Sequence, residues 1–467
     1  MIGAKVAVRS VVRNRRRSLM TVGSIAVGTA AILLIGALLA HLLLSIETAT
    51  VGRVGHLTIF KAGYSDFGAV DPLRYSIPDY ERVIRRLRED PELQSVTRVV
   101  TPVQSMFGLI SSPDSGASKT FFGRGVIWSD RQTMARWDPY RLNLGGPTSA
   151  SLRDDDVNAA IIGEGVARVL GLCERLRVEH CKSPPKPVPD TSLAAIPDED
   201  FSSLAELDGP VAQGPAASDS RPAADLLAST PNGAPNVMRV YVDRAERQVA
   251  KGLDDSAVAV QLGLAQSLVY GRNPPEVSGL IVQLNETAQL PRAEARLKAL
   301  FREPGLNLEY RTYEQLTPFY AQTRAFFKVL FTFISIIVGL IVVFTVSNAM
   351  MMSVLERTSE IGTMRALGAQ QGAVRNQFLL EGTVLGSAGA GAGALLALLL
   401  AFALNRSGLT WQPPTAAAPM PFRLYLAGDA VLILAVPLLL VAVACVASWL
   451  PARGAGRMTI VEALRHV

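Results

Sequence analysis

The stretch ERTSEIGTMRALGAQQGAVRNQFLLEG, residues 356–382, joins two apolar runs that are each long enough to cross a membrane. Its first half predicts a helix of about three turns that Gly368 ends in a left-handed cap. On that helix Ile361, Met364 and Leu367 would share one face. A short, charged helix held between two spans suits docking into the groove of a partner, although a membrane-surface helix that only joins the spans also fits.

Four apolar runs predict spanning helices, because roughly 30 Å of hydrocarbon needs about 20 residues at 1.5 Å each. The runs are residues 19–45, 329–352, 383–404 and 430–450. Between the first two lies the block 46–328, which is large enough for a folded domain. The sequence therefore predicts an α+β membrane protein with four transmembrane helices and a large α/β extracytoplasmic domain inserted between spans one and two.

Basic residues flank the spans unevenly. Residues 1–18 carry a net charge of +6, residues 353–377 of +1 and residues 451–467 of +2, although the whole chain is only +6. The positive-inside rule therefore predicts that both termini and the intervening loop are cytoplasmic. Since the positive charge lies at membrane flanks, we expect contact with membrane lipids and no binding of nucleic acid.

This orientation divides the chain into compartments. The basic amphipathic segment 1–18, the loop 353–382 and the tail 451–467 would be cytoplasmic, whereas 46–328 and the short loop 405–429 would be exported. A cleaved signal peptide is the alternative for the N-terminus, but its apolar core would be much shorter than the first run. We therefore expect a retained first span.

The exported block contains a cysteine pair and a segment of biased composition. Cys173 and Cys181 are close in sequence, so an oxidising compartment would allow a local disulfide. A metal site with His180 is the alternative, although no further ligands are near. Residues 182–236 are rich in Pro, Ala, Ser, Asp and Gly and lack hydrophobic periodicity, which predicts a flexible insertion.

Strand–helix–strand patterns lie near both ends of the block. The first runs through VGHLTIFKAGY, residues 54–64, to the helix and strand within residues 77–100. The second includes a strand at 276–285, a helix at 290–303 and a strand at 306–314. These patterns indicate a domain assembled from the two ends of the block, with other strands and a helix between them.

Small residues recur along the third span. Gly382, Gly386 and Ala390 follow at fourfold spacing, with Gly389 and Gly393 beside them. Such residues let helix backbones approach closely in a membrane. Packing within one chain and a seam between two copies both fit this pattern.

The sequence predicts no catalytic residues and no metal site. It contains no G-x-x-x-x-G-K-[ST] phosphate loop, no H-E-x-x-H and no G-x-S-x-G motif. We therefore expect a chain that is not an enzyme by itself and that holds no cofactor.

Two cytoplasmic stretches resemble a known family. NAMMMSVLERTSEIGTMRALGAQQGAVRNQFLLEG, residues 348–382, and ASWLPARGAGRMTIVEALRHV, residues 447–467, are similar to the signatures of MacB/FtsX/LolC-type (type VII) ABC transporter permeases. VGHLTIFKAGY and GLTWQPP, residues 408–414, look closer to the lipoprotein-releasing LolC/LolE branch. The arrangement of four spans with one large domain after the first also fits this family.

The resemblance implies partners and a coupling site. It implies two copies of an ABC ATPase subunit that bind ATP and Mg, a second permease copy or paralogue, and location in the bacterial inner membrane with the large domain in the periplasm. ATP-driven closure of the ATPases would move that domain. Carried over by position, the coupling residues would be Glu356, Arg357, Glu360, Gly362, Arg365 and Gly368.

Three functions remain open at this point. The first is extraction of a lipoprotein, or of another lipid-anchored or amphipathic substrate, from the membrane toward a periplasmic carrier. The second is a MacB-like efflux permease that works with an adaptor protein and an outer-membrane duct. The third is an FtsX-like regulator whose moving domain activates a cell-wall hydrolase.

Overall fold

The computed structural model describes residues 15–68, 72–142, 152–178, 181, 220–248, 251–303, 305–411, 420–426 and 430–459. The chain divides into two compact units. The helical unit holds the described residues within Met1–Glu47, Pro318–Trp411 and Met420–Val467. The α/β unit holds those within Thr48–Thr317.

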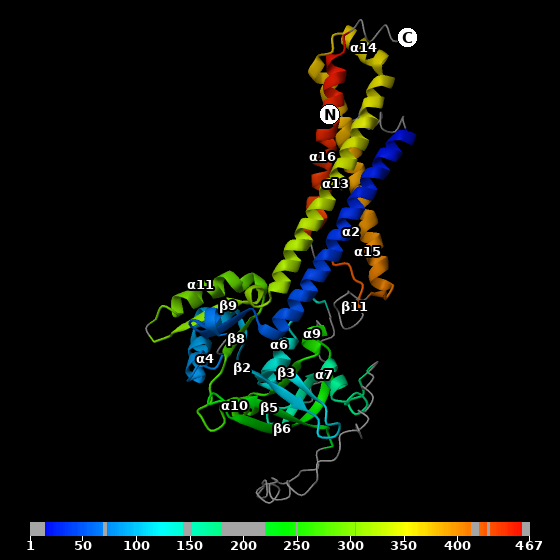
Figure 1. Ribbon diagram of the computed structural model, residues 1–467. Coiled ribbons are helices and arrows are strands. Elements are labelled where there is room, and N and C mark those ends of the chain that lie inside the picture. Colours follow the sequence, from blue (N-terminus) through cyan, green and yellow to red (C-terminus); the bar gives the residue numbers. More distant parts are fainter. Residues whose placement is uncertain are drawn as a thin grey trace, which may run out of the picture. The chain divides into compact units, whose positions relative to one another are not determined.

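Among the described residues, four helices are long and apolar enough to cross a membrane. They are α2 (Arg15–Val54), α13 (Pro318–Glu356), α15 (Gln371–Arg406) and α16 (Ala430–Arg457), seen in Figure 1. Each contains one predicted span and extends beyond it at one end or both. The chain is a membrane protein of four spans with a large α/β unit between the first two, so the predicted fold class is confirmed.

The glycines of α15 allow close packing against other helices of the same chain. An added Cβ at Gly386 would lie 2.8 Å from Ala444 Cβ on α16, and one at Gly389 would lie 2.6 Å from Ile25 Cβ on α2. Gly382 is equally tight against Ser448 on α16, and Gly393 against Ala26 and Thr29 on α2. Of the two alternatives for this stripe, the structure shows packing within the chain.

This packing predicts that a single methyl group at one position of α15 will loosen the helices. Gly393→Ala should lower the free energy of unfolding by about 1–3 kcal/mol, because the Cβ has no room against α2. Gly391→Ala is the matched control, since no heavy atom lies within 4 Å of its ideal Cβ. Thermal unfolding of both variants in one detergent checks this, and equal midpoints would contradict it.

The α/β unit contains nine paired strands among its described residues. They are β1 (Leu57–Lys61), β2 (Thr97–Ser111), β3 (Ser118–Val126), β4 (Ala159–Gly163), β5 (Ala223–Ser229), β6 (Pro235–Glu246), β7 (Ala257–Gln261), β8 (Gly279–Leu284) and β9 (Leu308–Thr312). A two-stranded pair, β10 (Thr410–Trp411) and β11 (Met420–Pro421), lies in the rest of the chain.

Short helices connect these strands. They are α3 (Tyr64–Phe67), α4 (Tyr80–Glu89), α5 (Pro91–Val96), α6 (Trp128–Ala135), α7 (Glu164–Val169), α9 (Lys251–Asp254), α10 (Leu262–Tyr270), the 3-10 helix η2 (Thr287–Gln289), α11 (Leu290–Leu300) and α12 (Tyr313–Leu316). Asp90 caps α5 by accepting hydrogen bonds from the backbone N–H groups of Glu92 and Leu93.

Six strands of this sheet close into a ring. In order they are β2, β3, β7, β4, β6 and β5, and β5 pairs with β2 again. Inward residues of the ring, such as Met106, Ile110 and Val240, form one core with side chains of α7 and α10. Closure leaves this part of the sheet with no free edge.

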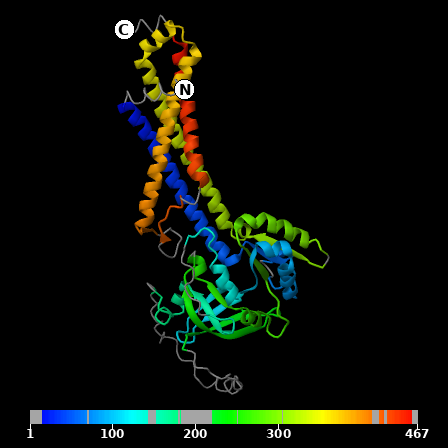
Figure 2. The same cartoon turned by 180° about the vertical axis from the view of Figure 1, so that it is seen from behind.

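The remaining strands extend from the first half of β2. There β2 pairs with β8, β8 with β1, and β1 with β9. Helices α4, α5 and α11 cover one face of these strands (Figure 2). Met134 of α6 packs against Val99, Val103 and Ile281. Because β1 and β9 come from opposite ends of the unit, the prediction of a domain assembled from both ends is confirmed.

The predicted flexible insertion 182–236 is wrong in its last part. Ala223–Ser229 is strand β5, which pairs with β2 and β6. Its inward side chains are Ala224, Leu226 and Ala228, and their small size hid the alternation within the biased composition. Residues 182–219 lie outside the described residues.

The cysteine pair lies just after α7. Cys173 and Cys181 are joined by a disulfide. Of the two alternatives for these cysteines, a disulfide or a metal site, the structure contains the disulfide. His180, the third residue of the metal alternative, lies outside the described residues.

His56 ties the first segment of the α/β unit to the last. Its ring is fully buried, Nδ1 accepts a hydrogen bond from the Leu284 N–H at 3.0 Å, and Nε2 lies 3.2 Å from Thr287 Oγ1. Its carbonyl accepts a hydrogen bond from the Tyr313 N–H at 2.9 Å. Just before it, Gly55 has a φ of +69°, which favours glycine, and an added Cβ would lie 2.8 Å from the Val282 carbonyl oxygen.

Burial lowers the pKa of His56 to about 4. A folded chain therefore keeps His56 neutral, whereas the unfolded chain binds a proton near the ordinary pKa of about 6.5. This contribution to stability should be full well above pH 6.5 and should fall by about 2 kcal/mol between pH 7.5 and 5.0. The His56→Gln variant should lack this pH-dependent part of the free energy of unfolding. Unfolding of the full chain at pH 7.5 and 5.0 measures it. An unchanged difference between the two pH values would contradict the assignment.

Candidate functional site

The linker between α13 and α15 contains the predicted helix, shifted by two residues. Helix α13 ends at Glu356, the backbone breaks at Arg357 with φ −111° and ψ 20°, and α14 (Thr358–Ala366) follows. Figure 1 shows α14 where α13 gives way to α15. The helix therefore begins after Arg357 and not at Glu356, because Arg357 leaves the helical path to reach a buried partner.

Gly368 ends α14 as predicted. It has a φ of +93°, its N–H donates to the Arg365 carbonyl at 3.1 Å, and the Ala369 N–H donates to the Met364 carbonyl at 3.0 Å. This pair of bonds satisfies two carbonyls at the helix end. No heavy atom lies within 4 Å of an ideal Cβ at Gly368, so the need for glycine is conformational and not steric.

Arg357 is the centre of a buried charge cluster. Its Nε donates to Glu360 Oε2 at 2.8 Å, and its Nη1 donates to Glu381 Oε2 at 3.1 Å on α15. Its guanidinium carbon lies 5.5 Å from the centre of the Phe378 ring. The side chains of Arg357 and Glu381 are only 13% and 7% exposed, so this pair holds the α13–α14 break against α15.

Two expectations about this cluster need correction. The resemblance placed Arg357 among residues that contact an ATPase, but its side chain is only 13% exposed and it is paired with Glu360 within the chain. Glu381 was absent from the predicted site. The signal for it was present, since it is an acid placed directly before the apolar run 383–404.

The buried pair predicts unequal costs for two arginine substitutions. Arg357→Met should lower the free energy of unfolding by about 3–5 kcal/mol, because Glu381 would stay buried without its partner. Arg17→Met is the matched control, since the side chains of the Arg17–Glu356 pair are 32% and 47% exposed and its loss should change the stability little.

The double variant Arg357→Met with Glu381→Leu should recover most of the loss, because both charges are then removed. Denaturant unfolding of the three variants and the parent in one detergent measures this. Equal losses for Arg357→Met and Arg17→Met would show that burial of the pair contributes nothing.

The apolar face of α14 is directed mainly into the helical unit. Ile361 is 1% exposed, Met364 is partly buried, and Leu367 is 84% exposed. The expectation of a shared apolar face for docking therefore holds only for Leu367. Gly362 is buried beside Ile361, on the inner side of the helix.

The other predicted residues lie at the two ends of α14. Glu356 accepts a hydrogen bond from Arg17 Nη1 of α2 at 2.6 Å, so the first helix contacts the entry to the linker. Arg365 Nη1 donates to the Ala369 carbonyl at 3.4 Å, near the glycine cap. The structure thus divides the six predicted residues into a buried centre and two ends.

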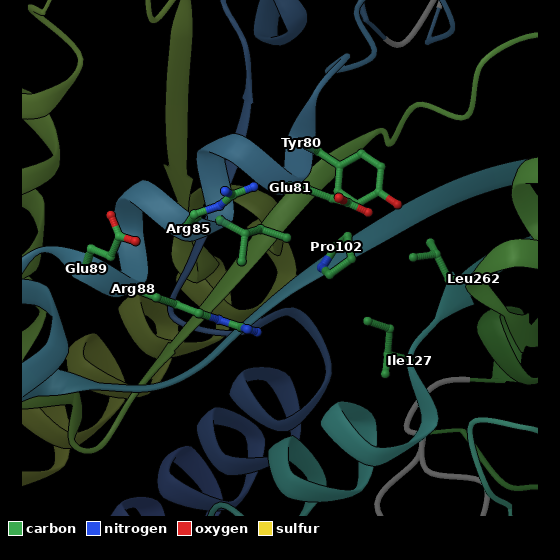
Figure 3. Close-up of a pocket in the computed structure, with 9 residues that line it drawn as sticks. Tyr80, Glu81, Arg85, Arg88, Glu89, Pro102, Ile127 and Leu262 are labelled. Atoms are coloured by element: carbon green, nitrogen blue, oxygen red, sulfur yellow. The ribbon is translucent and has the colours of Figure 1, made fainter.

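A hollow of about 510 Å³ lies on the α/β unit over α4 (Figure 3). Its apolar floor includes Pro102, Ile127 and Leu262, and its charged rim contains Glu81, Arg85, Arg88 and Glu89. Arg88 donates a hydrogen bond to the Val100 carbonyl at 2.8 Å, so one of its donors already has a partner within the chain. The two acidic and two basic residues of the rim give the hollow no net charge.

Within the described residues, no group of three or more His, Cys, Asp or Glu side chains could hold a metal ion. The site at α14 consists of ion pairs, a glycine cap and one exposed leucine. Such an arrangement can position a rigid element and present it to another protein.

Residues 332–460 match the family model described as FtsX-like permease C-terminal. This stretch includes most of α13 and all of α14, α15 and α16. This stretch is therefore similar to FtsX-like permease domains.

The relatives are macrolide export ATP-binding/permease proteins MacB. The protein of Shigella boydii serotype 4 is 36% identical over 143 residues, which are 31% of this chain and 20% of that one. The protein of Vibrio parahaemolyticus is 46% identical over 79 residues, 17% and 12% of the two chains. The protein of Hyphomonas neptunium is 28% identical over 169 residues, 36% and 25%.

The chain thus spans about a fifth of the length of the Shigella boydii relative. The periplasmic region of MacB from Actinobacillus actinomycetemcomitans aligns with 57% of this chain and 93% of its own length. That alignment has 12% identity and a TM-score of 0.31, which is too low to bear on the fold. The narrower resemblance to the LolC/LolE branch stays a prediction.

Proposed function

We propose that this chain is the permease subunit of an ABC transporter and that α14 docks into a separate ATPase chain. The observation that supports this most is the geometry of the linker in an FtsX-like permease domain. A buried ion pair and a glycine cap fix α14 rigidly, while Leu367 is left exposed at its end. A rigid helix with an exposed apolar anchor is a common form of recognition by a groove.

In this proposal the ATPase does the chemistry and the permease carries the movement. Two ATPase copies bind ATP and Mg and pull on α14 in each of two permease copies or paralogues. Helix α13 leaves the α14 junction and continues without interruption for 39 residues to Pro318. Displacement of α14 is therefore passed along one helix, which begins directly after α12 of the α/β unit.

The orientation belongs to the same proposal. Both termini and the loop 353–382 are cytoplasmic, and the α/β unit lies in the periplasm of a bacterial inner membrane. The excess of basic residues in 1–18 supports this orientation. The Cys173–Cys181 disulfide supports it as well, because disulfides persist in oxidising compartments.

For the substrate we propose a lipoprotein, or another lipid-anchored or amphipathic molecule, which the complex extracts from the membrane and passes to a periplasmic carrier. The second candidate is export with an adaptor, and the similarity to macrolide export proteins favours it. Mass spectrometry of ligands that co-purify with the full complex separates the two. A bound lipoprotein supports the first and a small apolar compound supports the second.

The docking proposal predicts a specific loss at the exposed leucine. Leu367→Ser should weaken association with the ATPase about tenfold or more, because an apolar anchor at an interface contributes about 2 kcal/mol or more. Folding should change by only about 0.5 kcal/mol, since the side chain is 84% exposed. Leu409→Ser is the control, with a leucine that is 53% exposed beyond the far end of α15.

Membrane level, co-purification with the ATPase and ATP hydrolysis are the measurements for both variants. If Leu367→Ser binds the ATPase like the parent, α14 is only a connector between two spans. Glu360→Lys is a poorer probe, because Glu360 is bonded to Arg357 and its reversal would disturb the fold as well as the surface.

A further inference from the structure

A cluster of arginines lies in the α/β unit, where α6 meets the end of β6. Glu246 accepts hydrogen bonds from Arg131 Nη2 at 2.5 Å and from Arg244 Nε at 2.9 Å. Arg244 also donates to Asp243 at 2.7 Å, and the neighbouring Arg247 donates to Glu164 at 2.8 Å. Each of these three carboxylates is therefore already engaged by an arginine.

Two further arginines belong to the cluster. Arg124 of β3 donates from Nη1 to the Arg53 carbonyl, in the last turn of α2, at 3.3 Å. Neither Arg53 nor Arg124 forms an ion pair with any residue that the structure describes. Both side chains are half-buried, so each keeps a part that is exposed.

The charge of this cluster is unbalanced. Burial, together with the nearby charges of Arg53 and Arg131, lowers the pKa of Arg124 to about 10. Burial would raise the pKa of Glu246, but Arg131 and Arg244 outweigh this and lower it, so Glu246 is ionised. One anion on the free guanidinium groups would remove a repulsion that the protein itself leaves in place.

We propose that Arg53, Arg124 and Arg131 form a binding site for a phosphate group. A guanidinium group offers a planar fork of N–H donors that matches two oxygens of a phosphate, and three such groups on three elements can surround one tetrahedral anion. The elements are the end of α2, strand β3 and helix α6. Glu246 does not repel the anion strongly, because two arginines already neutralise it.

The phosphate group can belong to a lipid headgroup or be the free ion, since both offer the same oxygens. Arg53 follows the apolar run 19–45 by eight residues in the same helix. Eight residues of helix rise about 12 Å, and the headgroup layer on each face is roughly 5–8 Å thick. A long arginine side chain can reach back over the difference, so a lipid headgroup is within range.

The test uses the full chain in a neutral detergent with chloride balancing the ionic strength. Inorganic phosphate is titrated calorimetrically in one arm. In the other arm, micelles receive short-chain phosphatidylglycerol or, as the phosphate-free comparison, short-chain diacylglycerol. The variants are Arg53→Gln, Arg53→Gln with Arg124→Gln, and a control with Arg86→Gln and Arg239→Gln. The control removes two arginines that form surface ion pairs with Glu303 and Asp225.

Saturable binding of inorganic phosphate to the parent and the control supports the site, with affinity about tenfold weaker in the single variant and roughly a hundredfold weaker in the double. Binding of phosphatidylglycerol alone, with the same losses, supports the site and identifies the lipid as the source. The proposal is overturned if neither probe binds the parent saturably. It is also overturned if Arg53→Gln binds like the parent, or if the control loses as much affinity as the double variant.

Discussion

The ion pair between Arg357 and Glu381 fixes the turn between α13 and α15, and the position of α14 depends on it. Two charges taken out of water are costly, and an apolar pair of the same size often gives equal or greater stability. An apolar pair, however, makes no hydrogen bonds and does not fix the angle between two helices. A guanidinium group has fixed donors, so Arg357 reaches Glu360 and Glu381 at once and sets the angle at which α14 begins. The consequence is a short helix with a defined orientation at the end of a long one.

The spans, the end of α14 and several strands could be predicted from the sequence, because the signals for them are local. The spans follow from the length of apolar runs, and the end of α14 follows from a glycine placed where a left-handed residue is needed. Strands β1, β8 and β9 were visible from alternation or continuous apolar character. Each of these features is decided by a few neighbouring residues.

The parts that could not be predicted depend on contacts between distant segments. Arg357 pairs with Glu381 only because the break between α13 and α14 lies against α15, and no spacing rule on one helix joins residues so far apart. The ring of six strands is set by pairings such as β3 with β7 and β4 with β6, which follow no sequential order. Helix α10 follows strand β7 directly, and its short apolar run fits either a strand or a helix.

The pairing of β1 with β9 has a consequence for how the protein is made. Leu57 pairs with Thr312, so the first strand of the α/β unit waits until nearly the whole unit has been synthesised. At about 5–20 residues per second, the roughly 250 intervening residues take on the order of 12–50 s. The ring lies entirely between these two strands in sequence and can close earlier. The outer strands therefore complete the unit last, shortly before the second span is synthesised. Insertion of α13 and completion of the sheet then fall close together in time.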